Sequence, residues 1–134
     1  AGGLPKLEVL TLGSTNIDEH GVAALSMPLR KHPKLQFVNF EENAIGDKGL
    51  AFLVDDLGKD EFKALTALRL NYCDLTDDGC AKLVSVLDHD RMPSICAIIG
   101  VDRSSGNHHI SDEACKAVED AVFKARVRTG RWVE

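Results

Sequence analysis

The apolar residues of the stretch 65–87 change their spacing halfway along it. Leu68 and Leu70 alternate with polar or small residues, as they would on one face of a strand, whereas Leu83 and Leu87 lie four apart, as on one face of a helix. The change falls at a polar Thr-Asp-Asp-Gly turn. The stretch therefore predicts one strand–loop–helix unit.

The same unit recurs along the chain. Copies begin near residues 7, 35, 65 and 95, in steps of 28, 30 and 30 residues. Equivalent positions of the first three copies hold Leu7, Leu10, Leu12, Thr15, Ile17, Gly21, Leu25 and Leu29; Leu35, Val38, Phe40, Asn43, Ile45, Gly49, Leu53 and Leu57; and Leu65, Leu68, Leu70, Cys73, Leu75, Gly79, Leu83 and Leu87. Self-similarity at this period is the signature of a solenoid.

The fourth copy is interrupted. It begins with Ile95, Ile98 and Gly100, and its helical pattern resumes at Ile110 after about five extra residues within 102–109. His108 and His109 lie in this insertion. They are only weak evidence for a metal site, because no Cys or carboxylate lies at a sequence spacing from them that is typical of metal ligands.

A basic C-terminal tail, 124–134, follows. There Trp132 either folds back as a cap together with Val127 or docks a partner.

The pattern predicts the fold class α/β. We expect a single domain, 1–134, forming a right-handed solenoid arc with a parallel sheet on the concave face and helices on the convex face. The expected strands lie near 8–12, 36–40, 66–70 and 96–100, and the expected helices near 18–31, 46–58, 77–89 and 112–126.

These repeats resemble leucine-rich repeats of the ribonuclease-inhibitor-like subfamily, which also occur in Ran GTPase-activating proteins, tropomodulins and the arrays of NOD-like receptors. The resemblance covers Leu4 to about Val122. It implies that Asn43 occupies a position where the family uses an asparagine or cysteine side chain to bond the backbone of neighbouring turns; Thr15 and Cys73 share that position. The matching positions are the buried ones, so the resemblance says little about function.

The first copy begins directly on a consensus strand, without a polar cap before it. A terminal repeat without a cap exposes part of its core. We therefore expect the chain to be a fragment of a longer array and to self-associate through its uncapped N-terminal end.

Composition narrows the classes of partner. A net charge of −5 and a pI near 5.5 argue against nucleic acid, and no apolar run approaches the roughly 20 residues needed to cross a membrane. The four cysteines form no C-x-x-C pair, and we interpret them as reduced thiols of a cytoplasmic protein.

No catalytic motif is recognisable. Asp88, His89 and Asp90 are adjacent in a loop, where neighbouring side chains rarely converge on one ion. The glycines at 100 and 106 do not frame a phosphate loop. We predict a protein that is not an enzyme and uses no cofactor or metal.

Candidate binding chemistry gathers on the concave side, where alternate strand residues point away from the core. We name as the concave patch Phe37, Asn39, Glu41, Glu42, Arg69, Asn71 and Tyr72. Arginine and tyrosine are frequent anchors of interfaces, although Arg69 could simply pair with Glu41.

We therefore predict a non-catalytic module that binds a protein partner, within a larger intracellular scaffold or regulator. The alternatives are a GTPase-activating regulator of a small GTPase and a purely structural spacer or cap. A convex substitution, Lys82→Glu, is expected to be neutral.

Overall fold

The computed structural model describes residues 8–102, 104 and 106–130. Strands and helices alternate as β1 (Val9–Thr11), α1 (Glu19–Arg30), β2 (Phe37–Asn39), α2 (Gly46–Val54), β3 (Ala67–Arg69), α3 (Asp77–Asp88), β4 (Ala97–Ile99) and α4 (Asp112–Thr129). The predicted fold class and order of elements are confirmed. Leu4, Leu7 and Trp132, which were named above, lie outside the described residues.

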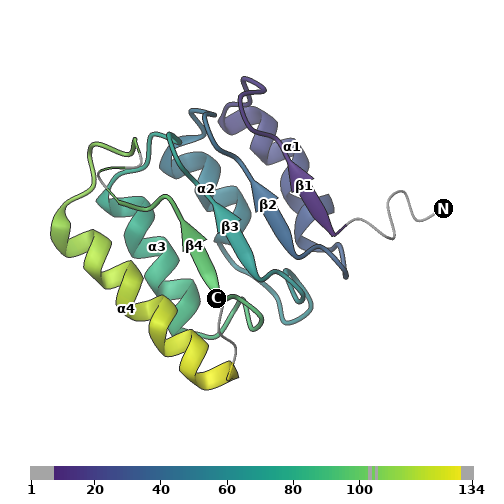
Figure 1. Ribbon diagram of the computed structural model, residues 1–134. Coiled ribbons are helices and arrows are strands. Elements are labelled where there is room, and N and C mark those ends of the chain that lie inside the picture. The colour runs from purple at the N-terminus through teal and green to yellow at the C-terminus, as the bar shows by residue number, and fades with distance from the viewer. Residues whose placement is uncertain (1–7, 103, 105, 131–134) are drawn as a thin grey trace.

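The four strands form one parallel sheet in the order β1-β2-β3-β4. Figure 1 shows them side by side, with the helices along one side of the sheet. Val38 pairs with Leu10 on one side and Leu68 on the other, as the repeat alignment predicts. A shift of one residue would turn every core side chain toward the concave face, so the apolar alternation sets the register.

The core lies between the sheet and the helices. In the middle of the array the strand residues Val38 and Leu68 are 1% and 2% exposed, and the helix residues Leu53 and Leu83 are 2% and 0% exposed. At the two ends of the sheet, Leu10 and Ile98 are only partly buried. Each repeat therefore buries its core against its neighbours.

The helix starts are linked from one repeat to the next. Thr76 and Ser111 cap α3 and α4 with their side chains. Each of these capping residues also bonds an aspartate in the first turn of the preceding helix. Asp47 accepts the Thr76 amide at 3.0 Å and its hydroxyl, and Asp77 accepts the Ser111 amide at 2.7 Å. The Ser111 bonds hold the pKa of Asp77 below its ordinary value.

Two helix ends differ from the prediction. Helix α2 ends at Val54 rather than near 58, because Asp55 is extended (ψ 138°) and Asp56 is left-handed (φ 53°). The chain beyond is held by Glu61, whose carboxylate accepts from Arg30 Nη2 at 2.8 Å and from the Gly58 amide at 2.9 Å. Helix α4 continues to Thr129, so the first part of the predicted tail is helical.

Candidate functional site

Two rows of side chains cross the concave face, one residue from each strand. The first row is Val9, Phe37, Ala67 and Ala97, and the second is Thr11, Asn39, Arg69 and Ile99. Val9 is 55% exposed and Ile99 39% exposed, so both add apolar surface that lies outside the predicted patch. Phe37 and Arg69, on adjacent strands, are partly exposed between them.

Arg69 lies near the middle of this surface with two polar neighbours. Its Nη2 is 3.4 Å from Glu41 Oε1, and its Nε donates to Asn71 Oδ1 at 3.1 Å. The Arg69 side chain is 39% exposed and that of Glu41 28% exposed. The pairing of Arg69 with Glu41 that we considered from the sequence is therefore present, but long for a charge-assisted hydrogen bond.

The structure corrects the placement of Asn39. We expected an exposed binding residue, but Asn39 is only 8% exposed. Its Oδ1 accepts the Glu41 amide at 2.8 Å, and its Nδ2 lies against the loop at Gly13. The side chain thus supports the turn that carries Glu41 instead of facing a partner directly.

Glu42 and Tyr72 stand at equivalent positions just after strands β2 and β3. Both are in the left-handed region, with φ of 60° and 55°, and Ser14 of the first repeat matches them with 54°. This turn makes both side chains exposed, and Tyr72 is 53% exposed. Glu42 Oε2 accepts from Ser14 Oγ at 2.9 Å, so of these two loop residues Tyr72 is the better candidate anchor.

Behind these loops, Asn43 joins the first two repeats. It is 1% exposed, its Oδ1 accepts the Ile17 amide at 2.8 Å, and its Nδ2 donates to Leu12 O at 2.6 Å and Phe40 O at 3.1 Å. Buried backbone groups left without such partners would cost free energy. The predicted structural role of Asn43 is confirmed.

Asn107 makes the same contacts in the fourth repeat, and sequence reasoning missed it. It is fully buried, its Oδ1 accepts the Leu75 amide at 3.0 Å, and its Nδ2 donates to Leu70 O and Gly100 O, both at 2.8 Å. We had assigned the whole segment 102–109 to a polar insertion. Aligning the fourth repeat backward from Ile110, instead of forward from its strand, would have identified Asn107.

The insertion lies mainly between Gly100 and Gly106. Gly106 directly precedes Asn107, as Glu42 precedes Asn43, and it shares the left-handed backbone with φ of 87°. A Cβ there would collide with the Tyr72 ring, so the ring packs directly against this glycine. Val101, directly after Gly100, is 7% exposed and lies within the core.

The buried thiols are unsuited to nucleophilic chemistry. Burial raises the pKa of Cys73 and of Cys80 to about 12, so both stay protonated at neutral pH. Cys73 Sγ instead donates to Phe40 O at 3.2 Å, which is a structural contact. None of the four cysteines, all of which lie among the described residues, forms a disulfide.

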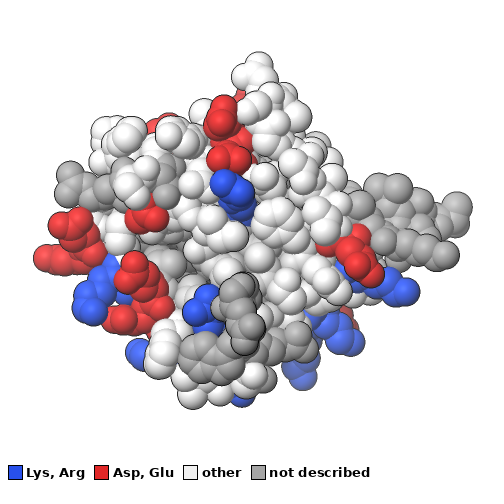
Figure 2. All heavy atoms as spheres, in the orientation of Figure 1, with Lys and Arg blue, Asp and Glu red and all other residues white. Residues whose placement is uncertain are grey.

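The surface charges do not converge on one reactive centre. Figure 2 shows acidic and basic side chains mostly toward the margins of the face seen in Figure 1. Within the described part of the chain, no group of three or more His, Cys, Asp or Glu side chains could hold a metal ion. His108 and His109 are both exposed. No helix among the described residues is long and apolar enough to cross a membrane.

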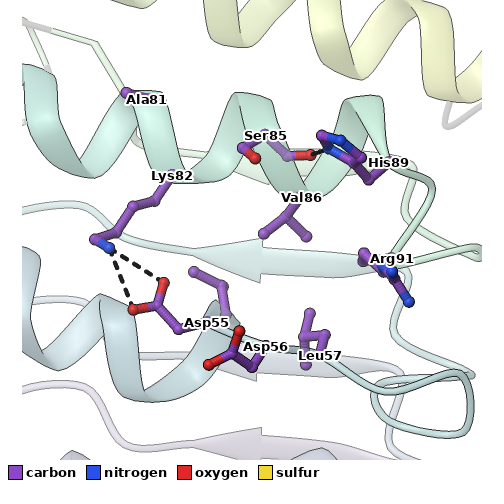
Figure 3. A pocket seen from close by; sticks show the side chains of 10 residues that line it. Asp55, Asp56, Leu57, Ala81, Lys82, Ser85, Val86, His89 and Arg91 are labelled. Atoms are coloured by element: carbon purple, nitrogen blue, oxygen red, sulfur yellow. Dashed lines mark hydrogen bonds and ion pairs between the residues drawn. The ribbon is translucent and has the colours of Figure 1, made fainter.

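A groove of about 510 Å³ lies on the helical side between α2 and α3 (Figure 3). Several of its polar side chains bond groups within the protein. Lys82 Nζ is 3.1 and 3.2 Å from the two Asp55 carboxylate oxygens, and a His89 ring nitrogen is 2.7 Å from Ser85 O. Lys82→Glu would place two carboxylates together, so it is not the neutral control that we expected.

Known proteins resemble this chain along most of its length. The family described as "Leucine Rich repeat" matches residues 31–54 and 64–84. The ribonuclease inhibitor of Sus scrofa is 37% identical over 82 residues, which are 61% of this chain and 18% of that protein. The ribonuclease inhibitor of Mus musculus is 35% identical over the same length, again 61% of this chain and 18% of the relative.

A second group of relatives is longer. The human "NACHT, LRR and PYD domains-containing protein 13" is 27% identical over 116 residues, which are 87% of this chain and 10% of that protein. The matches therefore span less than a fifth of the length of any of these three relatives.

Proposed function

We propose that the concave face of this chain, whose repeats are similar to leucine-rich repeats of the ribonuclease-inhibitor-like type, binds a protein partner. The binding surface is the exposed part of the concave patch: Phe37, Glu41, Glu42, Arg69, Asn71 and Tyr72. Val9 and Ile99 extend it with apolar contacts.

The position of Arg69 carries this proposal. Its guanidinium stands on an exposed sheet face, next to the apolar Ile99 on β4, and its Glu41 contact is 3.4 Å long. An exposed ion pair of this kind contributes only ~0–1 kcal/mol. A carboxylate of a partner can therefore replace Glu41 at little cost, while an apolar side chain packs on Phe37 or Tyr72.

The wider role follows from the same proposal. We propose a non-catalytic module of a larger cytoplasmic scaffold or regulator, in keeping with its free thiols. Activation of a small GTPase and a purely structural spacer are the two alternatives that experiment must separate from it.

We also propose that the chain self-associates through its N-terminal end. Within the described residues, Val9 is 55% exposed and Leu12 is partly buried, whereas Phe40, the equivalent of Leu12 in the second repeat, is 0% exposed. Such an apolar strand edge favours association.

The test of the concave surface compares three variants in affinity capture. Arg69→Gln removes the cation without placing a second carboxylate beside Glu41, and Tyr72→Ala removes the aromatic ring. Lys48→Glu, at an exposed position in the first turn of α2, serves as the convex control. The free energy of unfolding of Arg69→Gln and Lys48→Glu should lie within about 0.5 kcal/mol of the parent's, as is usual for exposed sites.

The expected result is a protein captured by the parent and by Lys48→Glu, and lost or at least tenfold weaker with Arg69→Gln. Equal binding by Arg69→Gln and Tyr72→Ala would rule out the concave patch. Stimulation of GTP hydrolysis by a captured GTPase would favour the regulator. A chain that captures nothing would favour the spacer.

A further inference from the structure

The groove between α2 and α3 holds two charges that the protein does not neutralise itself (Figure 3). Lys82 and Asp55 compensate each other, since the Lys82 ammonium lies 3.1 and 3.2 Å from the two carboxylate oxygens. Within the part of the chain that the structure describes, the side chains of Asp56 and Arg91 form neither a hydrogen bond nor an ion pair. The groove therefore keeps one uncompensated anion and one uncompensated cation.

The local backbone holds both of these residues in place. Asp56 has left-handed backbone (φ 53°), which aspartate tolerates better than most residues. Arg91 follows the left-handed Asp90 (φ 55°), and its amide donates to Val86 O at 3.0 Å, as in a Schellman motif. The two charges thus stand at defined positions, one just beyond the end of α2 and one just beyond the end of α3.

An apolar floor separates the two charges. Leu57 and Val86 line the groove and are 4% and 8% exposed, and Figure 3 shows them between Asp56 and Arg91. A ligand that reaches both charges has to cross this floor, and methylene groups can do so without losing a hydrogen bond. The volume of about 510 Å³ lies within the range of small-ligand sites.

We propose that this groove binds the C-terminal lysine of a polypeptide. The terminal carboxylate pairs with Arg91, the ε-ammonium pairs with Asp56, and the methylene groups between them lie on Leu57 and Val86. An α-amino acid with an uncharged side chain has its ammonium and carboxylate on one carbon atom, too close together to reach both sides of this floor. An internal lysine lacks the carboxylate.

Free lysine has both groups but carries a third charge. Its α-ammonium would lie beside the carboxylate that Arg91 binds, where the like charge of the guanidinium repels it. In a polypeptide the same nitrogen is an uncharged amide, and because Arg91 is exposed the preceding chain can continue into solvent. The groove lies on the helical side, so this inference is independent of the concave patch.

The test titrates the isotope-labelled full chain with three probes and follows its backbone amides by NMR. Nα-acetyl-L-lysine represents a C-terminal lysine, its amide lacks the carboxylate, and L-lysine adds the α-ammonium. We expect the first probe to shift the amides of Leu57, Val86 and Arg91 saturably, with a Kd of about 1–10 mM, because exposed ion pairs are weak. The other two probes should each bind at least about threefold more weakly.

Two variants test the assigned contacts. Arg91→Gln and Asp56→Asn should each weaken binding of Nα-acetyl-L-lysine at least about threefold, because each removes one exposed ion pair. Asparagine also tolerates the left-handed backbone. The matched controls, Lys124→Gln and Asp88→Asn, remove the same charges at exposed positions outside the groove and should bind like the parent.

Equal binding of Nα-acetyl-L-lysine and its amide would overturn the proposal, as would unchanged binding by Arg91→Gln or by Asp56→Asn. The proposal also falls if the parent shows no saturable shifts at probe concentrations about tenfold above the expected Kd range. Tighter binding of L-lysine would assign the groove to the free amino acid instead of a polypeptide terminus. Thermal melts of all variants show that weaker binding does not reflect unfolding.

Discussion

The second and fourth repeats reach the same buried asparagine through loops of different length. Two residues separate Phe40 from Asn43, whereas six separate Gly100 from Asn107. Both side chains nevertheless accept one equivalent amide of the preceding repeat, from Ile17 or Leu75. Both also donate to one carbonyl of that repeat and to one of their own.

This comparison shows which part of a repeat is constrained. An amide and a carbonyl of the preceding repeat bond each asparagine, so its position is set partly from outside its own loop. The loop before the asparagine only has to end in a residue with left-handed backbone, as it does at Glu42 and at Gly106. The extra length of the fourth repeat lies between Gly100 and Gly106, before the asparagine.

The largest expected effect comes from removing either asparagine. Asn107→Ala and Asn43→Ala each leave several buried backbone groups without partners, and each should lower the free energy of unfolding by ~1–3 kcal/mol. Chemical denaturation with matched conditions measures both. His108→Ala, at the exposed neighbouring position, is the control and should change little. A near-neutral Asn107→Ala would show that the two repeats are not equivalent.

A smaller loss is expected at the position between them. Cys73 occupies the same place in the third repeat, but its thiol donates weakly to Phe40 O. Cys73→Ala should therefore cost about 1 kcal/mol, less than either asparagine variant. The ranking is measured by thermal shift of the three single variants side by side. A larger loss of stability for Cys73→Ala would mean that packing, not hydrogen bonding, dominates at these three equivalent positions.

The smallest effect should follow deletion of residues 102–105, which gives the fourth repeat the loop length of the second. Gly106 and Asn107 keep their order, so the four bonds of Asn107 can re-form. The free energy of unfolding should change by less than about 1 kcal/mol, the closure entropy of a threefold change in loop length. Failure of this variant to fold would show that the insertion itself supports the repeat.

The sequence predicted those features that follow from burial alone. Strand register came from apolar residues that the neighbouring repeats force into the core, and Val38 and Leu68 pair as expected. Asn43 was found because it follows its strand at the consensus distance. Asn107 was missed because it lies within the segment 102–109 that we assigned to the insertion, whereas the left-handed Gly106 marks where the repeat resumes.

Other features depended on polar contacts that have no periodic signal. Asn39 alternates like an exposed residue, yet its side chain turns to bond the Glu41 amide. Leu57 continues a helical spacing, yet α2 has ended and Leu57 is buried from an irregular segment. An apolar side chain can be buried from helical or from irregular backbone. The spacing of apolar residues therefore predicts burial better than it predicts where a helix ends.

The close approach at Gly79 bears on the curvature of the whole arc. A Cβ on Gly79 would collide with Asp47 Oδ1, so a side chain there would have to displace the Asp47 carboxylate of α2 that accepts the Thr76 amide. Strands in a sheet are spaced by about 4.8 Å and packed helices by roughly 8–10 Å, and this mismatch bends a solenoid toward its strands. Gly79 lets α2 and α3 approach closely at their N-terminal ends. Because the helix spacing helps to set the radius of the arc, this glycine also bears on the width of a partner that fits the concave face.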